Sequence, residues 1–311
     1  MTLISPTNSG LYCQAGDFYI DPWKPVDRAV VTHAHADHAR PGSRRYLAAT
    51  EGDAILRMRL GTDADFQFVQ YGEAVQLNGT SVSLHPAGHM RGSAQVRIEH
   101  QGEVCVVSGD YKIASDPTAE QFEPLKCHTF VTESTFGLPI YKWPSAEEVI
   151  AEIHQWWREN QSAGRCSLLF AYAVGKAQRL LASVDPSVGP LFAHGAILKG
   201  CAAYRDSGCT LPEVGNVLEQ DRGYDWSQAL VLAPPSARGS TWLRRFGNTS
   251  LAAASGWMRV RGVRRRRTLD RGFVFSDHAD WHGLNQAINA AEAESVWITH
   301  GYTTQLRDYL S

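Results

Sequence analysis

The stretch VVTHAHADHA, residues 30–39, decides how this chain is interpreted. It places three imidazoles and a carboxylate within six residues, directly after an apolar run: His33, His35, Asp37 and His38. In extended backbone alternate side chains share a face, so His33, His35 and Asp37 are expected to converge while the last histidine points elsewhere. Neutral imidazole and carboxylate are ligands for zinc and similar cations. The segment predicts half of a metal site, and the alternative is a solvated histidine-rich loop.

Further candidate ligands end other apolar runs: His89 in SVSLHPAGH, Asp110 in EVCVVSGD, Glu133 in TFVTE, His278 in FVFSDH and His300 in SVWITH. Each follows a short β-branched or aromatic run, so we expect them along one rim of a sheet. The predicted ligands of a first ion are His33, His35 and His89. Those of a second ion are Asp37, His38 and His300, with Asp110 bridging the two. Two ions roughly 3.5–4 Å apart favour hydrolysis at phosphorus.

These motifs resemble those of a known family. THAHADH, PAGH and SGD are similar to the successive metal-binding motifs of the metallo-β-lactamase fold, and Asp21 in FYIDPW resembles its early acidic residue, which orients ligands. VTEST, FSDHAD and ITHG resemble three further motifs of the β-CASP branch, nucleases that include Artemis and the mRNA 3′-end-processing endonuclease. Residues 255–281 look most like the bacterial DNA ligase-associated exonucleases. The resemblance implies an α/β chain, a metallo-β-lactamase αββα sandwich with an inserted α/β β-CASP domain.

The order of motifs predicts the domain organisation. AQVRIEH and EVCVVSGD flank Gln101 and Gly102, a turn-forming pair that predicts a hairpin. Residues 144–160 have helical spacing, with Ser145 and Glu148 forming a capping box. A strand and a helix near Gly175 follow, which is α/β alternation. Because the last motifs return only afterwards, we predict a metallo-β-lactamase domain in 1–140 and 253–311, with an insertion at 141–252.

The resemblance also suggests catalytic residues, which are Asp37, His278 and Glu133. His278 is expected to be the general acid that protonates the leaving oxygen, and Glu133 its carboxylate partner. Two alternatives stay open for His278: it ligates a metal, or it binds a nonbridging phosphate oxygen.

Substrate contacts are predicted from basic residues. The net charge is −2, yet seven arginines lie between residues 259 and 271, and a local patch of this kind attracts phosphates. We expect Arg264, Arg265, Arg266 and Arg267 to line a groove; the alternative is a solvated basic turn or a targeting patch. Lys176, at a strand-to-helix junction, is a candidate phosphate contact by resemblance, or otherwise an ordinary helix start. Arg238 is a weaker candidate.

Together these features predict a nuclease that uses two divalent ions, with zinc favoured and manganese or iron as alternatives. His300 resembles the RNA-cleaving β-CASP enzymes, whereas the residues around the arginine run resemble the DNA ligase-associated group. We favour DNA, with exonuclease trimming of single-stranded or flapped ends in repair, beside a ligase and a helicase by resemblance only. The alternatives are an RNA-processing nuclease, a small-molecule metallo-hydrolase, and a binding scaffold with a degenerate site.

Composition is consistent with an enzyme of this kind. The chain has 311 residues, of which 43% are hydrophobic, enough for one large domain or two interlocked ones. We find no apolar run of membrane-spanning length and no secretory signal pattern, so we expect a cytoplasmic protein without a membrane partner. The six cysteines are interpreted as reduced thiols, with a structural zinc at Cys201 and Cys209 as the alternative.

Overall fold

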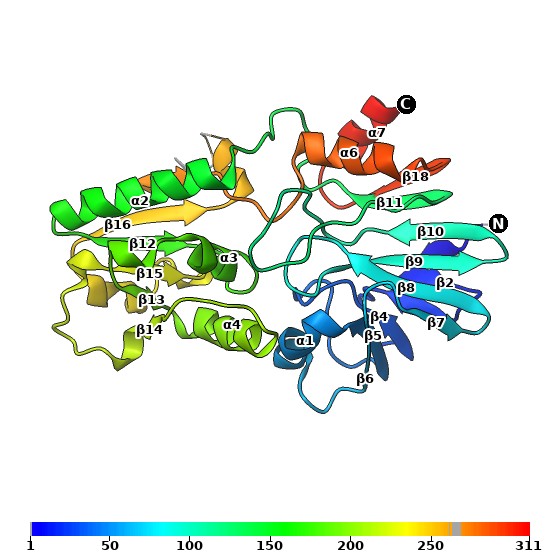
Figure 1. Ribbon diagram of the computed structural model, residues 1–311, viewed down its shortest axis with the longest axis horizontal. Helices are drawn as coiled ribbons and strands as arrows, with labels where there is room; N and C mark the ends of the chain where they lie inside the picture. The colour runs from blue at the N-terminus through cyan, green and yellow to red at the C-terminus, as the bar shows by residue number, and fades with distance from the viewer. Residues whose placement is uncertain (1, 261, 263–268) are drawn as a thin grey trace. The chain divides into compact units, whose positions relative to one another are not determined.

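The computed structural model describes residues 2–260, 262 and 269–311, and it forms two compact units (Figure 1). One unit joins Met1–Tyr141 to His278–Ser311, and the other is Lys142–Asp277. The second unit begins within one residue of the predicted insertion but ends at Asp277, not at residue 252. The reason is that residue 252 lies inside a strand of the second unit's sheet, which cannot be divided between domains.

The first unit contains two six-stranded sheets. The first sheet has the spatial order β1-β2-β3-β4-β5-β6, antiparallel as far as β3 and parallel beyond it. Its strands are β1 (Ile4–Thr7), β2 (Gly10–Cys13), β3 (Phe18–Ile20), β4 (Arg28–Val30), β5 (Arg45–Ala49) and β6 (Phe66–Val69). Helix α1 (Asp53–Leu60) connects the last two.

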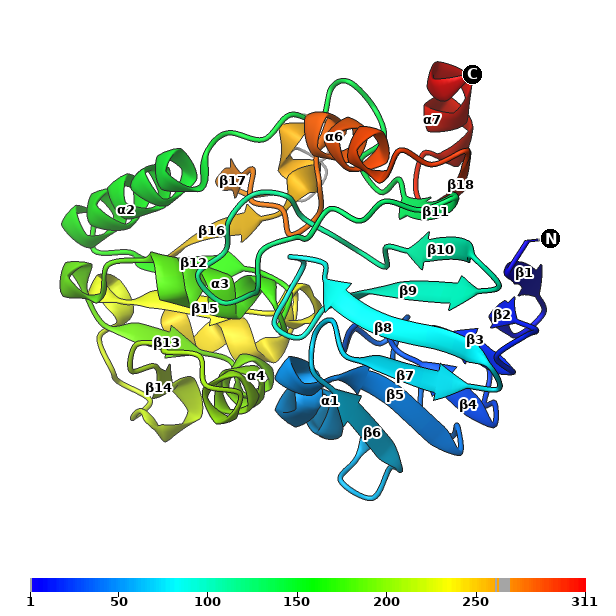
Figure 2. The same ribbon diagram turned by 45° about the vertical axis from the view of Figure 1, so that its right-hand side comes forward.

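The second sheet has the order β18-β11-β10-β9-β8-β7. Its strands are β7 (Ala74–Leu77), β8 (Thr80–Pro86), β9 (Ala94–His100), β10 (Glu103–Val107), β11 (Thr129–Glu133) and β18 (Ser295–Thr299). The pairing makes β8, β10, β11 and β18 run in the same direction. Their C-terminal ends therefore lie at one edge (Figure 2). The predicted hairpin is confirmed, because β9 and β10 pair antiparallel around Gln101 and Gly102.

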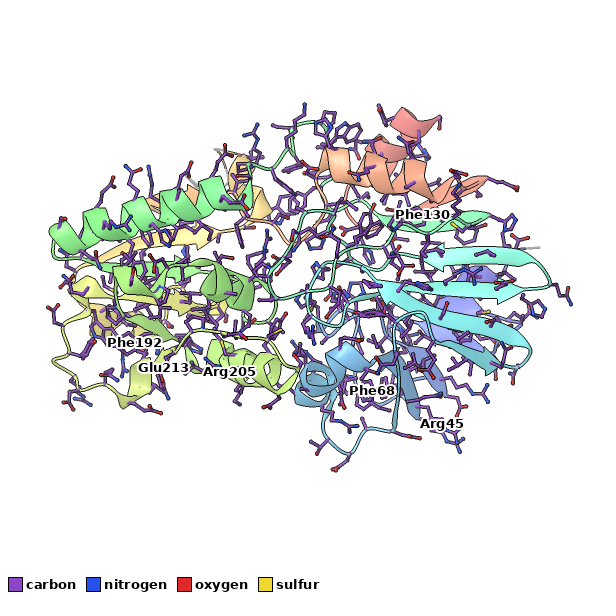
Figure 3. All side chains as sticks on the ribbon, in the orientation of Figure 1. Arg45, Phe68, Phe130, Phe192, Arg205 and Glu213 are labelled. Carbon is purple, nitrogen blue, oxygen red and sulfur yellow. The ribbon has the colours of Figure 1, made fainter. Side chains whose placement is uncertain are left out.

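Alternating burial along the strands places one core between the two sheets. Val30 and Leu47 of the first sheet and Val82, Val96 and Val131 of the second belong to this core. The opposite face of the second sheet packs against two helices, α6 (Trp281–Ala291) and α7 (Thr303–Leu310). Residues from both helices share that second core with Phe130 of β11, labelled in Figure 3.

The second unit is built on an all-parallel sheet of order β14-β13-β15-β12-β16-β17. Its strands are β12 (Cys166–Phe170), β13 (Leu191–Ala193), β14 (Gly215–Asn216), β15 (Leu230–Ala233), β16 (Thr249–Ala254) and β17 (Arg271–Phe273). Every residue of β12 is buried, as expected for a parallel strand covered on both faces. The helices described in this unit are α2 (Ala146–Ser162), α3 (Lys176–Ser183) and α4 (Gly195–Asp206).

Helix α2 begins where the sequence predicts. Ser145 accepts a hydrogen bond from the Glu148 amide, and the Glu148 carboxylate accepts one from the Ser145 amide. This capping box satisfies two donors that the first turn leaves free. On the buried face of the helix, the indoles of Trp156 and Trp157 donate to Ser250 Oγ and the Gln228 carbonyl. These bonds join α2 to β16 and to the short 3-10 helix Trp226–Gln228 that precedes β15.

Two further expectations can be compared with the structure. All six cysteines are thiols rather than disulfides, as predicted, and five of them are buried. Among the described residues, no helix combines the length and the apolar character needed to cross a bilayer.

Candidate metal centre

The ligand loop, residues 31–40, follows β4 of the first sheet and is not extended. The amides of His38 and Ala39 both donate to the His35 carbonyl, at 3.1 and 2.8 Å. This turn buries the His38 side chain and leaves that of Asp37 74% exposed. The prediction that His33, His35 and Asp37 share one face of an extended segment is therefore wrong, because the chain turns after His35.

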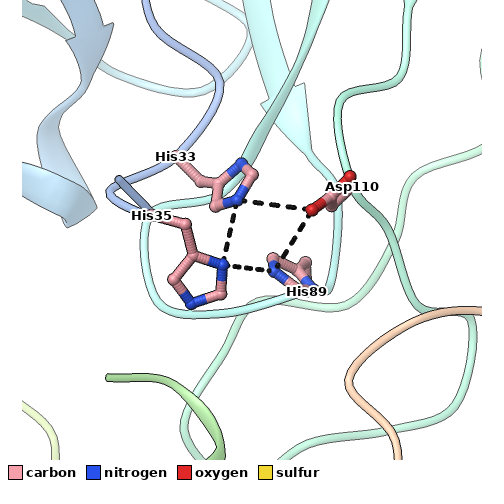
Figure 4. Close-up of side chains that lie close together, drawn as sticks. All are labelled: His33, His35, His89 and Asp110. Carbon is pink, nitrogen blue, oxygen red and sulfur yellow. Dashed lines mark hydrogen bonds and ion pairs between the residues drawn. The ribbon is translucent and has the colours of Figure 1, made fainter. Parts of the chain in front are cut away.

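Four ligand atoms converge beside this loop (Figure 4). His33 Nε2 and His89 Nε2 each lie 3.2 Å from His35 Nδ1. Asp110 Oδ2 lies 3.6 Å from His33 Nε2 and 3.9 Å from His89 Nε2. All four atoms are within 4.8 Å of one another. We call these four residues the histidine cluster; three are buried and His35 is half-buried.

Strand ends and two glycines bring these residues together. His89 follows β8 and Asp110 follows β10, and those strands end at the same sheet edge. Gly88, just before His89, has a φ of +74°. Gly109 has a φ of +58°, and a Cβ there would come within 2.8 Å of Thr32, so a glycine is needed for Asp110 to approach the ligand loop. The prediction of a single rim is confirmed for the residues that end or follow strands of the second sheet, which are His89, Asp110, Glu133 and His300. It is wrong for His278, which follows β17 of the second unit's sheet.

Asp21 and Thr32 orient the histidines. Asp21 Oδ2 accepts from Thr32 Oγ1 at 2.6 Å and lies 2.7 Å from His38 Nδ1, while Oδ1 accepts from the Thr32 amide. Because its hydroxyl hydrogen goes to Asp21, Thr32 Oγ1 can accept from His33 Nδ1, 3.1 Å away. This assignment places a hydrogen on Nδ1 of both rings and directs cation binding to Nε2, which in His38 must first lose its own proton. Thr32 was not among the predicted residues, although its position directly before the first histidine was a signal.

The residues predicted for a second ion lie around Asp110 in a looser group. His38 Nε2 is 3.5 Å from Asp110 Oδ2 and 3.9 Å from Asp37 Oδ2. The rings of His38 and His300 have centroids 5.7 Å apart. His300 is exposed and has a φ of +54°. The structure thus brings these side chains near one another, and the two-ion assignment remains a prediction.

The electrostatics of the site favour the metal-binding states of His33 and Asp110 but the protonated state of His38. Burial, followed by the neighbouring imidazoles of His38 and His89, holds the pKa of His33 well below its usual value. Burial would lower the pKa of His38, but the carboxylates of Asp21 and Asp110 outweigh it and raise that pKa well above its usual value. Burial would raise the pKa of Asp110, yet the imidazoles of His278 and His38 hold it well below its usual range. Asp110 is therefore ionised and His33 neutral at pH 7.

A histidine–carboxylate pair adjoins the cluster. His278 Nδ1 lies 2.9 Å from both carboxylate oxygens of Glu133. Glu133, the last residue of β11, is 1% exposed and also accepts from the Tyr111 amide at 2.8 Å. The centroid of the His278 ring is 4.7 Å from that of His89. The two predicted catalytic partners are thus in contact beside the metal ligands, and their roles remain predictions.

The residues predicted to contact the substrate are not all exposed, and some lie outside the described residues. Lys176 is 4% exposed, and its Nζ lies 2.5 Å from Asp277 Oδ2. Arg238 is half-buried. The predicted groove residues Arg264, Arg265, Arg266 and Arg267 lie outside the described residues. The phosphate contacts therefore stay predictions, and for Lys176 the structure provides a carboxylate partner instead.

Comparison with known proteins bears on the family. No model of a known protein family matches the chain. It is 31% identical over 305 residues to a probable DNA ligase of Opitutus terrae, covering 97% of this chain and 29% of that protein. It is 28% identical to ribonuclease TTHA0252 of Thermus thermophilus, covering 65% and 50%, and 25% identical to endoribonuclease YSH1 of Yarrowia lipolytica, covering 58% and 26%. The chain is a homologue of the metallo-β-lactamase β-CASP nucleases.

A solved structure resembles this β-CASP homologue in fold. A protein of unknown function from Enterococcus faecalis superposes with a TM-score of 0.59 at 12% identity, covering 90% of this chain and 76% of that one. At this identity the likeness concerns the fold alone. The chain spans half the length of the Thermus protein and less than a third of the length of the Opitutus protein.

Proposed function

We propose that this chain is a metal-dependent phosphodiesterase that cleaves DNA, as an exonuclease on single-stranded or flapped ends. The observation that carries the proposal is the convergence of the histidine cluster beside the His278–Glu133 pair. In fold, we propose a metallo-β-lactamase αββα sandwich with a β-CASP insertion. The two face-to-face sheets, with α6 and α7 packed outside one of them, support this assignment.

The donor set is suited to divalent cations. The cluster combines imidazole nitrogens with an ionised carboxylate, a mixture that suits zinc, with manganese or iron as alternatives. His33, His35, His89 and Asp110 would hold one ion, and Asp37, His38, His300 and Asp110 a second. Bound there, divalent ions supply Lewis acidity and lower the pKa of water at the site.

The chain's own residues provide orientation and a proton. Asp21 and Thr32 fix the ring orientations of His33 and His38. Glu133 accepts from His278 Nδ1, so the opposite edge of that ring can protonate the oxygen that leaves phosphorus. Water bonds to phosphorus as the bond to the leaving oxygen breaks, and the leaving 3′ or 5′ hydroxyl keeps the proton from His278. The proton that the water gives up passes to solvent, from which the imidazole is reprotonated.

DNA is the favoured substrate because the match that spans 97% of this chain is to a probable DNA ligase. A DNA ligase and a helicase are the proposed partners in repair. RNA cleavage is the second candidate, favoured by the two named ribonucleases among the relatives and by His300.

The experiment is to incubate the metal-loaded protein with end-labelled single-stranded DNA, flapped DNA and RNA of matched sequence. We expect shortening of the DNA strands, and loss of that activity in Asp110→Asn. Cleavage of RNA alone would replace DNA by the second candidate. Intact polymers together with hydrolysis of a lactone or β-lactam would overturn the nuclease proposal in favour of a small-molecule hydrolase.

A further inference from the structure

The second unit contains a buried ionic cluster, which we call the Asp277 anchor: Lys176, Arg179 and Asp277. Their exposed fractions are 4%, 5% and 4%. Lys176 Nζ lies 2.5 Å from Asp277 Oδ2, and Arg179 NH1 lies 3.3 Å from Oδ1. Each carboxylate oxygen thus has its own cation. Charges this deeply buried are stable only when they are paired, so the burial of these three side chains depends on their ion pairs.

Helix α3 supplies both cations from its first turn. Lys176 and Arg179 are three residues apart, so their side chains lie on one face of the helix. Arg179 NH1 also donates to the Ser276 carbonyl at 2.7 Å, and its guanidinium carbon lies 4.1 Å from the centroid of the Phe275 ring. Three consecutive residues, 275–277, are therefore each held by α3.

The next residue is His278, where the chain returns to the first unit. There the following segment is fastened separately. The Ala279 amide donates to the Tyr111 carbonyl at 2.7 Å, and Asp280 caps α6 by accepting from the Gly283 amide at 2.8 Å. His278 thus directly follows the segment that α3 holds and directly precedes the segment that is fastened within the first unit.

We propose that Lys176 and Arg179 are positioning residues, which fix the backbone before His278 and so aim its imidazole. This inference rests on the proposed function, in which His278 is the proton donor. It gives Lys176 a role other than phosphate binding, since its ammonium is buried and already paired with a carboxylate. A displacement of about 1 Å can cost roughly 10²-fold in rate, so an anchor at the adjacent residue has a measurable effect.

The test compares Lys176→Met with Lys199→Met, the same change at an exposed position on α4. With a labelled oligonucleotide, Lys176→Met should lower kcat by roughly 10–100-fold, with KM and the salt dependence of binding unchanged. Lys176→Arg should recover most of the rate, because it restores a cation opposite Asp277. On bis(p-nitrophenyl) phosphate, whose leaving group needs no protonation, the deficit should shrink.

Other outcomes overturn the proposal. A raised KM, with the slope of log affinity against log salt flattened by roughly 0.7, would identify Lys176 as a phosphate contact. Equal deficits on both substrates would indicate a general structural role. Should Lys176→Met fail to fold, Arg179→Gln removes the Ser276 contact, keeps the Lys176–Asp277 pair, and should give the same kcat pattern.

A readout without activity separates this proposal from the proposed function. Hydrogen exchange of the amides of residues 275–279 should be faster in Lys176→Met than in the unsubstituted protein and in Lys199→Met. Unchanged exchange would contradict the anchor. If Lys176→Met exchanges faster but the unsubstituted protein cleaves no polymer, the role of the Asp277 anchor is supported and the proposed nuclease activity is contradicted.

Discussion

Two buried polar clusters of this molecule differ in whether their charges are paired within the protein. The Asp277 anchor pairs the two oxygens of one carboxylate with one cation each. The histidine cluster brings three imidazole nitrogens and one carboxylate oxygen within 4.8 Å of one another. Such donors are stable in a buried volume only when a cation joins them. A cluster whose charges are paired within the protein therefore indicates a structural or positioning role, whereas a cluster of metal-ligating atoms alone indicates a ligand site.

The largest effect is expected at Asp110, which contacts both predicted sets of ligands. Asp110→Asn should lose cleavage by orders of magnitude and bind fewer than two equivalents of metal, while the fold persists. Metal analysis and circular dichroism measure both, with Asp65→Asn, an exposed carboxylate of the first unit, as the control. Full activity in Asp110→Asn would contradict the assignment of the histidine cluster as a metal-binding site.

A second large effect separates chemistry from metal binding. His278→Ala should keep its metal and bind substrate normally, yet cleave roughly 10²–10⁴-fold more slowly, because leaving-group protonation is removed. The matched control is His282→Ala, an exposed position on α6. Rates at saturating oligonucleotide, measured together with metal content, provide the test. Loss of metal in His278→Ala would instead make that residue a ligand.

Much of the candidate site was predictable from sequence because several of its residues follow recognisable strands. His89, Asp110 and Glu133 lie at or just beyond β8, β10 and β11, where strand direction alone predicts a shared edge. The turn after His35 was not predictable, since it depends on main-chain hydrogen bonds to the His35 carbonyl.

The Asp277 anchor was not predictable either. Lys176 and Asp277 are 101 residues apart in the chain, and no local pattern relates them. The same is true of the end of the second unit, because β16 and β17 join its sheet only through tertiary pairing.

A moderate effect is expected from the residue that orients the ligands. The Asp21 carboxylate accepts hydrogen bonds from the Thr32 hydroxyl and from His38 Nδ1, and Asp21→Asn replaces it with a weaker acceptor. Metal affinity should therefore fall by roughly 10–100-fold. Competition with a chromophoric chelator measures this change. Asp17→Asn, whose carboxylate accepts from the exposed Tyr12 hydroxyl, is the control. Equal affinities in the two variants would mean that the histidines need no orienting carboxylate.

A smaller effect on catalysis is expected from the arginine run. Replacing Arg264, Arg265, Arg266 and Arg267 with Ser should flatten the slope of log affinity against log salt by roughly 0.7 for each phosphate that is no longer neutralised. Turnover at saturating substrate and hydrolysis of bis(p-nitrophenyl) phosphate should change little. Filter binding of a single-stranded oligonucleotide across salt concentrations measures the slope. If the slope does not change, these residues do not bind the substrate.

The smallest effect concerns a single imidazole in the second unit. His154 Nε2 accepts from the Asp185 amide at 2.9 Å, and burial lowers the pKa of His154. The folded state therefore binds this proton less readily than the unfolded state. The stability that the lowered pKa of His154 contributes is fully present above the unfolded pKa of about 6.5. This contribution declines as the pH falls below that value. Thermal unfolding at pH 8 and 5.5 should show a smaller decline in His154→Gln, and equal declines would contradict this sign.

The most direct test of the central claim is metal content measured alongside cleavage. The protein is stripped with a chelator and then reconstituted with zinc or manganese, and both quantities are followed on end-labelled single-stranded DNA. We expect cleavage to disappear with the metal and to return as the metal bound per chain rises. Undiminished cleavage by metal-free protein would contradict the account, because the histidine cluster would then have no part in the chemistry.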